Sequence, residues 1–150
     1  MRTAIVGVGN SLMRDEGVGV HVARALADVR LPDGVEVIDA GTDPDVVFDL
    51  DGFDRVIVVD AARGGGSPGT VYRFAGDVVG LDLGEGRQAC HDVGFLDTLR
   101  RVARDALDIL ILGVEPEEIE WGLDLSPVLR QSVPRVVQIV QQELRGYRCS

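Results

Sequence analysis

Two carboxylates and one imidazole stand at the ends of three different predicted elements of this chain. Asp60 follows an apolar stretch typical of a buried strand, whereas Glu16 and His91 stand at or shortly before helical patterns. Ligand sites in α/β sheets lie at the edge where strands end and helices begin, so we expect these side chains at one edge. Two carboxylates and one imidazole can hold a divalent ion and leave positions open for water or substrate. The sequence therefore predicts a metal site formed by Glu16, Asp60 and His91.

Each of these residues also has a simpler interpretation. Glu16 would stabilise a helix start through the helix dipole, Asp60 would cap a loop, and His91 would be a capping or surface residue. Spacing in the sequence leaves both interpretations open. Asp15, which stands beside Glu16, receives no role from the sequence.

A glycine-containing loop between the first strand and the first helix raises the alternative of a dinucleotide-binding fold. Gly7 and Gly9 fit the first two glycines of the GxGxxG fingerprint, but Leu12 stands where the third is needed. Asp15 and Glu16 would also bring negative charge toward a pyrophosphate. The loop is therefore better explained as a metal site than as a phosphate site.

The sequence gives little support for a nucleophilic side chain. Cys90 adjoins His91, but neighbours in sequence need not form a hydrogen-bonded thiol and imidazole pair. Ser11 lies in no GxSxG motif, and His21 fits the flank of a helix. The chain has no lysine, which excludes Schiff-base chemistry, a Ser-Lys dyad and a P-loop.

The composition favours one soluble domain over residues 1–150. The chain is 45% hydrophobic and has a net charge of -10, from 15 basic and 25 acidic residues, which argues against nucleic-acid binding. Its apolar runs, such as 108–114, are far too short to cross a membrane, and we see no signal peptide. Cys90 and Cys149 form no CxxC motif. We expect a monomeric cytoplasmic protein.

Strand and helix patterns alternate along the chain. Strands are predicted at 4–8, 35–40, 55–61, 70–74 and 108–114, with 70–74 as an antiparallel edge strand. Helices are predicted at 18–29, at 44–50, around 96–106 and after Ser126, where Pro134 should divide a short helix from a long one. This order predicts a three-layer α/β/α sandwich with a sheet of about five mostly parallel strands.

Seven segments carry a resemblance to a known family, and they follow one another in order along nearly the whole chain. They are GVGNSLMRDEGVG at 7–19, DAGT at 39–42, VVDA at 58–61, PGTV at 68–71, CHDVG at 90–94, GVEP at 113–116 and GLDLSPVL at 122–129. Together they resemble the hydrogenase maturation endopeptidase family. The first segment is the most specific of them.

The resemblance implies a protease that removes a short C-terminal extension from the large-subunit precursor of a nickel-iron hydrogenase after nickel insertion. The nickel ligands of the family fall on Glu16, Asp60 and His91, the trio that position and chemistry also single out. The nickel would arrive on the precursor, although another divalent ion could occupy the site in the isolated protein. The nickel-containing precursor is the expected partner.

The resemblance also indicates residues near the cleft. Asp39 matches an acid of the family and is a candidate for substrate positioning or proton transfer. Attack by water, assisted by nickel as a Lewis acid or by Glu16 or Asp39 as general base, would cut the peptide as in a carboxylate-dependent, aspartyl-type protease. We expect substrate contacts at Asn10, Gly41 and Thr42.

Two alternatives stay open. A nickel-binding chaperone or checkpoint protein would use the same three ligands to inspect nickel without cutting a peptide. A small phosphate or nucleotide enzyme is weakened by the acidic charge, by the absence of lysine and by the failed glycine fingerprint.

Overall fold

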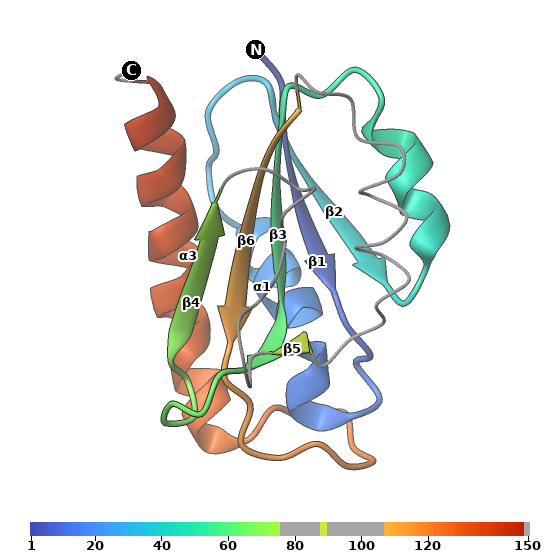
Figure 1. The fold of residues 1–150 in the computed structure, drawn as a ribbon, viewed down its shortest axis with the longest axis vertical. Helices are drawn as coiled ribbons and strands as arrows, with labels where there is room; N and C mark the ends of the chain where they lie inside the picture. Colours follow the sequence, from blue (N-terminus) through green and yellow to red (C-terminus); the bar gives the residue numbers. More distant parts are fainter. Residues whose placement is uncertain (76–87, 90–106, 149–150) are drawn as a thin grey trace.

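A twisted, mostly parallel sheet forms the centre of the protein (Figure 1). The computed structural model describes residues 1–75, 88–89 and 107–148. The strands are β1 (Thr3–Val8), β2 (Val35–Gly41), β3 (Arg55–Arg63), β4 (Val71–Ala75), β5 (Gln88–Ala89) and β6 (Asp108–Val114). The main path runs in the order β2-β1-β3-β6-β4, and β5 pairs with the end of β3. The expected sheet of about five strands is confirmed.

The direction of each strand agrees with the expected parallel arrangement. β1 pairs in parallel with β2 and β3, and β3 pairs in parallel with β6. β4 is antiparallel to β6 at one edge, as expected for this segment. Its partner is not β3, which precedes it in the chain, because β6 lies between them. The central strands β3 and β6 are buried along almost their whole length, which explains their continuous apolar sequences.

Helices pack on both faces of this sheet. α1 (Val18–Leu26) and α3 (Pro127–Arg148) cover one face, where their apolar side chains form the larger core with alternate residues of the strands. The 3-10 helix η2 (Pro44–Leu50) packs Val47 and Leu50 into a second core on the opposite face. A shorter 3-10 helix, η1 (Arg14–Gly17), precedes α1. The α/β/α arrangement is confirmed, while the helix expected around 96–106 lies outside the described residues.

The prediction that Pro134 divides the last helix is wrong. α3 runs without a break through Pro134, which lies on its exposed side. A proline removes one backbone hydrogen bond, but water can solvate the freed carbonyl group there. Leu129 and Val136, both fully buried, hold the helix to the core on either side of the proline. Packing therefore outweighs the local defect.

Other element boundaries shift by a few residues. α1 ends at Leu26 instead of continuing to residue 29, and β3 continues to Arg63 because Ala62 and Arg63 pair with β5. Among the described residues, no helix is both long and apolar enough to cross a membrane.

Candidate active site

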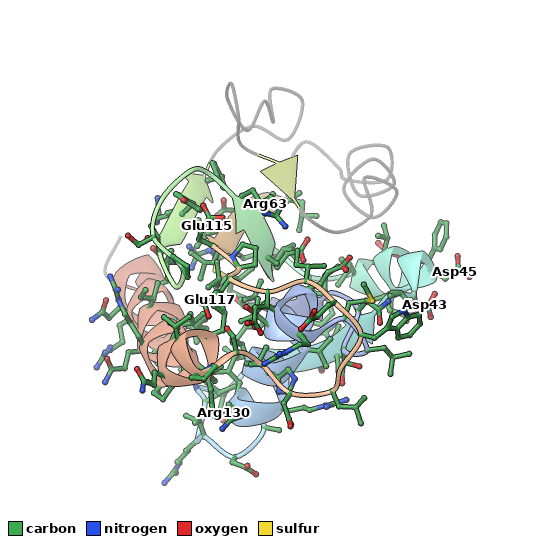
Figure 2. The ribbon with its side chains drawn as sticks, turned by 90° about the horizontal axis from the view of Figure 1, so that it is seen from below. Asp43, Asp45, Arg63, Glu115, Glu117 and Arg130 are labelled. Atoms are coloured by element: carbon green, nitrogen blue, oxygen red, sulfur yellow. The ribbon has the colours of Figure 1, made fainter. Side chains whose placement is uncertain are left out.

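The carboxyl ends of the parallel strands meet at one edge of the sheet, the lower edge in Figure 1. Figure 2 views the molecule from this side and shows the loop before α3 crossing beneath the sheet. η1 follows β1 at this edge, and the segment 115–126 joins β6 to α3. This is where an open α/β sheet places ligands.

Asp60 is a buried carboxylate near the end of β3, only 6% exposed. Alternate residues of a strand share a face, so the side chain of Asp60 lies on the same face as those of Val56 and Val58. This is the face of the sheet opposite α1. The backbone N–H of Ala61 donates a 2.8 Å hydrogen bond to its Oδ1. Burial raises the pKa of Asp60 well above the ordinary value; the hydrogen bond from Ala61 opposes this shift, and the negative charge of Glu16 adds to it.

Glu16 lies on η1, and its charge reaches the carboxyl group of Asp60. η1 contacts β3, so two of the three predicted ligands lie on neighbouring elements at the same edge of the sheet, although they are 44 residues apart in the chain, from position 16 to position 60. Gly9 makes the turn into η1 possible. It has a φ of +141°, and a Cβ at this position would lie 2.1 Å from the carbonyl oxygen of Glu16. A glycine is thus required where the loop closes onto η1.

The third predicted ligand, His91, lies outside the described residues, and so does Cys90. The strand β5 ends one residue before Cys90, and its Ala89 pairs with Ala62 of β3. Ala62 is two residues beyond Asp60 in the sequence. The chain that leads to His91 is thereby attached to the strand that carries Asp60. Within the described part of the chain, no group of three or more His, Cys, Asp or Glu side chains could hold a metal ion.

The structure separates Asp39 from this pair of carboxylates. Asp39 forms an ion pair of 3.6 Å with Arg24 of α1 and therefore lies on the α1 face of the sheet. Asp60 lies on the other face, and β1 separates the two strands. Asp39 remains a predicted catalytic residue, but its observed contact is with a surface cation.

The three predicted substrate-contact residues lie at the carboxyl edge, where Gly41 ends β2 and Asn10 and Thr42 belong to the loops that follow β1 and β2. The side-chain oxygen of Asn10 accepts a 3.0 Å hydrogen bond from the N–H of Leu12, which fixes the turn after β1. The carbonyl of Gly41 accepts one of 2.9 Å from the N–H of Gly9, and this bond joins the loops after β1 and β2. Thr42 is exposed next to Gly41.

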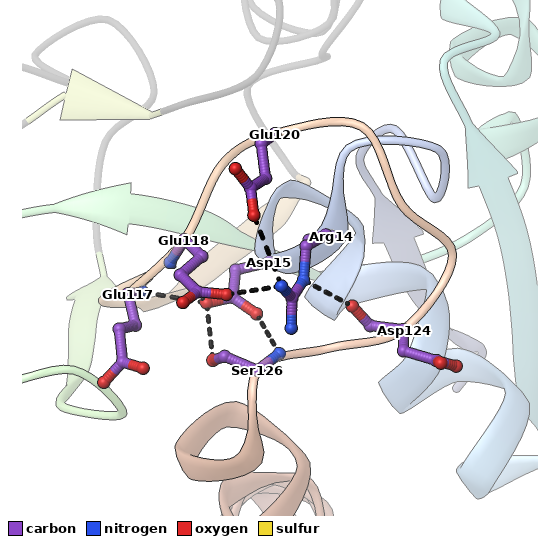
Figure 3. A network of polar contacts seen from close by, with 7 residues as sticks. All are labelled: Arg14, Asp15, Glu117, Glu118, Glu120, Asp124 and Ser126. Atoms are coloured by element: carbon purple, nitrogen blue, oxygen red, sulfur yellow. Dashed lines mark hydrogen bonds and ion pairs between the residues drawn. The ribbon is translucent and has the colours of Figure 1, made fainter.

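Asp15 has a role that the sequence did not reveal. Its carboxylate is fully buried and accepts four hydrogen bonds from the segment 115–126 (Figure 3). The donors are the backbone N–H groups of Glu117 at 2.9 Å, Glu118 at 2.8 Å and Ser126 at 2.8 Å, and the Ser126 hydroxyl at 2.7 Å. Asp15 thus attaches η1, and with it Glu16, to the start of α3.

Arg14 completes this connection from the outer side. Its Nη1 pairs with Glu118 at 2.6 Å and with Glu120 at 3.4 Å, and its Nε donates to the carbonyl of Asp124 at 3.2 Å. Its φ of +47° is unusual for a residue with a side chain and implies a strained backbone that these contacts hold in place. The roles of Arg14 and Asp15 depend on contact partners that are far away in the sequence, so the sequence alone does not reveal them.

Glu115 is a second buried carboxylate at this edge that the sequence did not single out. It accepts hydrogen bonds from the N–H groups of Gly64 at 2.8 Å and Gly66 at 3.1 Å and from the Tyr72 hydroxyl at 2.8 Å. It therefore organises the glycine-rich turn that follows the Asp60 strand.

His21 lies on α1 as expected. Burial is the first cause of the lowered pKa of His21, followed by the positive charge of Arg24.

Comparisons with known proteins give a consistent result. Residues 20–143 match a family model described as hydrogenase maturation protease. The hydrogenase expression/formation protein HoxM of Azotobacter vinelandii is 37% identical over 134 residues, which cover 86% of this chain and 63% of that protein. The hydrogenase 2 maturation protease of Escherichia coli K12 is 30% identical, over 97% of this chain and 92% of that protein.

The same result comes from solved structures. The [NiFe] hydrogenase maturation protease HybD from Thermococcus kodakarensis superimposes with a TM-score of 0.82 at 29% identity. The match covers 96% of this chain and 99% of that chain. This protein spans only 63% of the Azotobacter relative, but almost the whole length of the Thermococcus protease.

Proposed function

Because the chain belongs to the hydrogenase maturation protease family, we propose that it is an endopeptidase that removes a C-terminal extension from a hydrogenase large-subunit precursor after nickel insertion. The observation that carries this proposal is the contact of η1, which carries Glu16, with β3, which carries the buried Asp60, at the carboxyl edge of the sheet. A pair of carboxylates in this position suits the recognition of a divalent ion, which would relieve their mutual repulsion.

In this proposal the nickel belongs to the substrate. The precursor presents nickel on its own cysteines, and Glu16, Asp60 and His91 complete its coordination. The pairing of Ala89 with Ala62 supports the inclusion of His91, because it joins the preceding segment to the Asp60 strand. Nickel binding would replace the proton that burial favours on Asp60. A precursor without nickel would lack this point of attachment and stay uncut.

Peptide cleavage then needs one water molecule. Its oxygen forms a bond to the scissile carbonyl carbon while a carboxylate takes its proton, and the C–N bond breaks as the leaving amine receives a proton. Nickel would polarise the carbonyl as a Lewis acid. Glu16 and Asp39 are the two candidate bases, and the structure favours Glu16, because η1 contacts the strand that carries Asp60 whereas Asp39 pairs with Arg24 on the other face.

Mass spectrometry of nickel-loaded and nickel-free precursor, each incubated with the purified protein, tests this function. We expect removal of the extension from the nickel-loaded precursor alone, and loss of processing with Asp60→Asn or His91→Ala. Equal processing of both precursors would refute nickel recognition. Nickel-dependent binding with no cleavage product would instead indicate a checkpoint protein that inspects the metal.

A variant of Cys90 separates two chemical routes. If water attacks directly, Cys90→Ala should process the nickel-loaded precursor at the rate of the unmodified protein. Complete loss of cleavage by a normally folded Cys90→Ala protein would point to a thiol nucleophile.

A further inference from the structure

Three large apolar side chains stand exposed at the carboxyl edge. Leu12 is 48% exposed, Trp121 is 79% exposed and Leu123 is 68% exposed. We call these three residues the apolar patch. Leu12 comes from the loop before η1, whereas the other two come from the segment 115–126. Single exposed apolar residues are common, but a group of them on adjacent loops is typical of an interaction site.

Backbone hydrogen bonds hold the two parts of the apolar patch together. The N–H of Gly122 donates to the carbonyl of Leu12 at 2.9 Å, and the carbonyl of Gly122 accepts from the N–H of Arg14 at 3.0 Å. Gly122 lies between Trp121 and Leu123, so both side chains flank the residue that is bonded to the Leu12 loop. The exposure therefore belongs to a fixed surface.

The buried Asp15 adds to this rigidity. Its four hydrogen bonds fix both ends of the segment that carries Trp121 and Leu123, at Glu117 and Glu118 on one side and at Ser126 on the other. A surface that is ordered before binding loses little conformational entropy when a partner docks. The protein thus holds apolar side chains in water at a place where they add nothing to its own core.

The segment that carries Trp121 and Leu123 of the apolar patch is acidic. The segment 115–126 has five acidic residues and no lysine or arginine; the acids are Glu115, Glu117, Glu118, Glu120 and Asp124. Arg14 offsets part of this charge through its pairs with Glu118 and Glu120. Glu117 and Asp124 are exposed. A partner with lysine or arginine beside apolar side chains would complement this surface, and a cation could also stack on the indole ring.

The apolar patch lies next to the candidate active site. Leu12 precedes Glu16 by four residues in the same short connection between β1 and α1, from position 12 to position 16. A polypeptide held at Leu12 would therefore contact the same connection that carries Glu16. The same edge of the sheet therefore carries a place for chemistry and a place for a protein chain.

We propose that the apolar patch is the docking site for a segment of the hydrogenase large-subunit precursor that carries apolar side chains beside lysine or arginine. This inference rests on the proposed function and adds a recognition surface separate from nickel. A second copy of this chain is a poorer occupant, because two molecules with a net charge of -10 would bring like-charged rims together.

The test uses Trp121→Ala with Phe48→Ala as its matched control, since Phe48 is 62% exposed on η2, away from the segment 115–126. We expect Trp121→Ala to raise the KM for nickel-loaded precursor by roughly tenfold, as a central aromatic anchor of an interface does, and to leave kcat within about twofold. Phe48→Ala should change neither, and Trp121→Phe should restore most of the KM. Thermal unfolding should show that both alanine variants fold normally.

Binding to immobilised precursor, measured without turnover, keeps this test independent of the proteolysis. We expect Trp121→Ala to weaken binding by a similar factor, and added salt to weaken binding of the unmodified protein. Equal binding of Trp121→Ala and Phe48→Ala would overturn the docking site, even if processing is normal. A further outcome is that Trp121→Ala loses binding while the unmodified protein binds the precursor but does not process it. This result would support the docking site and refute the protease function. Dissociation of a dimer by Trp121→Ala, with precursor binding intact, would assign the patch to self-association instead.

Discussion

Ser126 gives Asp15 two hydrogen bonds across 111 residues of sequence, one from its backbone N–H at 2.8 Å and one from its hydroxyl at 2.7 Å. Both groups are fully buried. Ser126 immediately precedes α3, whereas Asp15 belongs to η1 and adjoins Glu16. The same carboxylate thus ties the start of the last helix to the connection that carries the candidate base.

Asp15→Asn should destabilise the protein by about 3 kcal/mol, because an amide puts N–H donors where the pocket already supplies donors to both carboxylate oxygens. Ser126→Ala keeps the backbone donor and removes only the hydroxyl, so we expect a smaller loss, about 1 kcal/mol. Urea unfolding of the two variants gives the comparison. Equal losses would show that the backbone bonds to Asp15 add little to stability.

Asp60→Asn should make the metal-free protein more stable at neutral pH. The pKa of Asp60 is raised in the folded state, so its contribution to stability is complete below the unfolded pKa and is lost as the pH rises through the folded value. Asparagine cannot ionise, and its side-chain oxygen can still accept from the N–H of Ala61. The gain in Tm over the unmodified protein should therefore grow between pH 4 and pH 8.

The control for this experiment is Asp28→Asn, a change of the same type at an exposed position after α1. Both variants are measured in a chelator, so that no divalent ion screens Glu16 from Asp60. A Tm difference for Asp60→Asn that does not change with pH would contradict the raised pKa. Loss of processing together with a gain in stability would be typical of a functional site whose charges oppose folding.

Comparison of Asp60 with Asp15 shows how far the sequence could lead to the site. Asp60 follows an apolar stretch of a strand and Glu16 stands shortly before a helical pattern, so the sheet topology alone predicts that they share an edge. The role of Asp15 depends on Ser126, whose position relative to η1 is decided only by the packing of α3. Local patterns carry no information about such a distant contact.

The fold shows the same division between local and distant information. The apolar sequences of β3 and β6 predicted central strands correctly, because burial on both faces leaves a continuous signal. Pro134 misled the prediction because its local effect is opposed by core contacts of Leu129 and Val136 elsewhere in the helix. Tertiary packing overrides a helix breaker there.

Glu143→Gln should destabilise the protein, and more strongly at neutral than at acid pH. Glu143 pairs with Arg73 and, at 3.2 Å, with the buried Arg55, which also lies 3.3 Å from Asp108. The pKa of Glu143 is lowered, first by its hydrogen bond with Arg73 and further by Arg55. The stabilisation that Glu143 provides is therefore present above its unfolded pKa and is lost as the pH falls through its folded pKa.

We expect a loss of about 2 kcal/mol at pH 7 for Glu143→Gln, because Arg55 stays buried with one charged partner fewer. Arg73→Gln is the matched variant. Its side chain is 52% exposed, so solvent screens the pair with Glu143 and the loss should stay below about 1 kcal/mol. Urea unfolding at pH 7 and pH 4 measures both. Equal losses for the two variants at pH 7 would contradict the importance of Arg55 burial.

Gly19→Ala should separate the first helix from the sheet and disturb the site without touching a charged group. A Cβ at position 19 would lie 2.1 Å from the carbonyl oxygen of Val59 and 2.4 Å from that of Val8, so α1 must move away from both strands. Val59 precedes Asp60, and Glu16 lies one turn before Gly19, so the movement should also change the approach of the two carboxylates. We expect a loss of about 2 kcal/mol or more, as overpacking of a core produces, together with reduced processing of the precursor.

Gly146→Ala is the control, because no atom lies within 4 Å of a Cβ at that position in α3 and alanine favours a helix. It should preserve processing and raise stability slightly in urea unfolding. A Gly19→Ala protein as stable and active as Gly146→Ala would show that the close contact of α1 with the sheet is not needed to position Glu16.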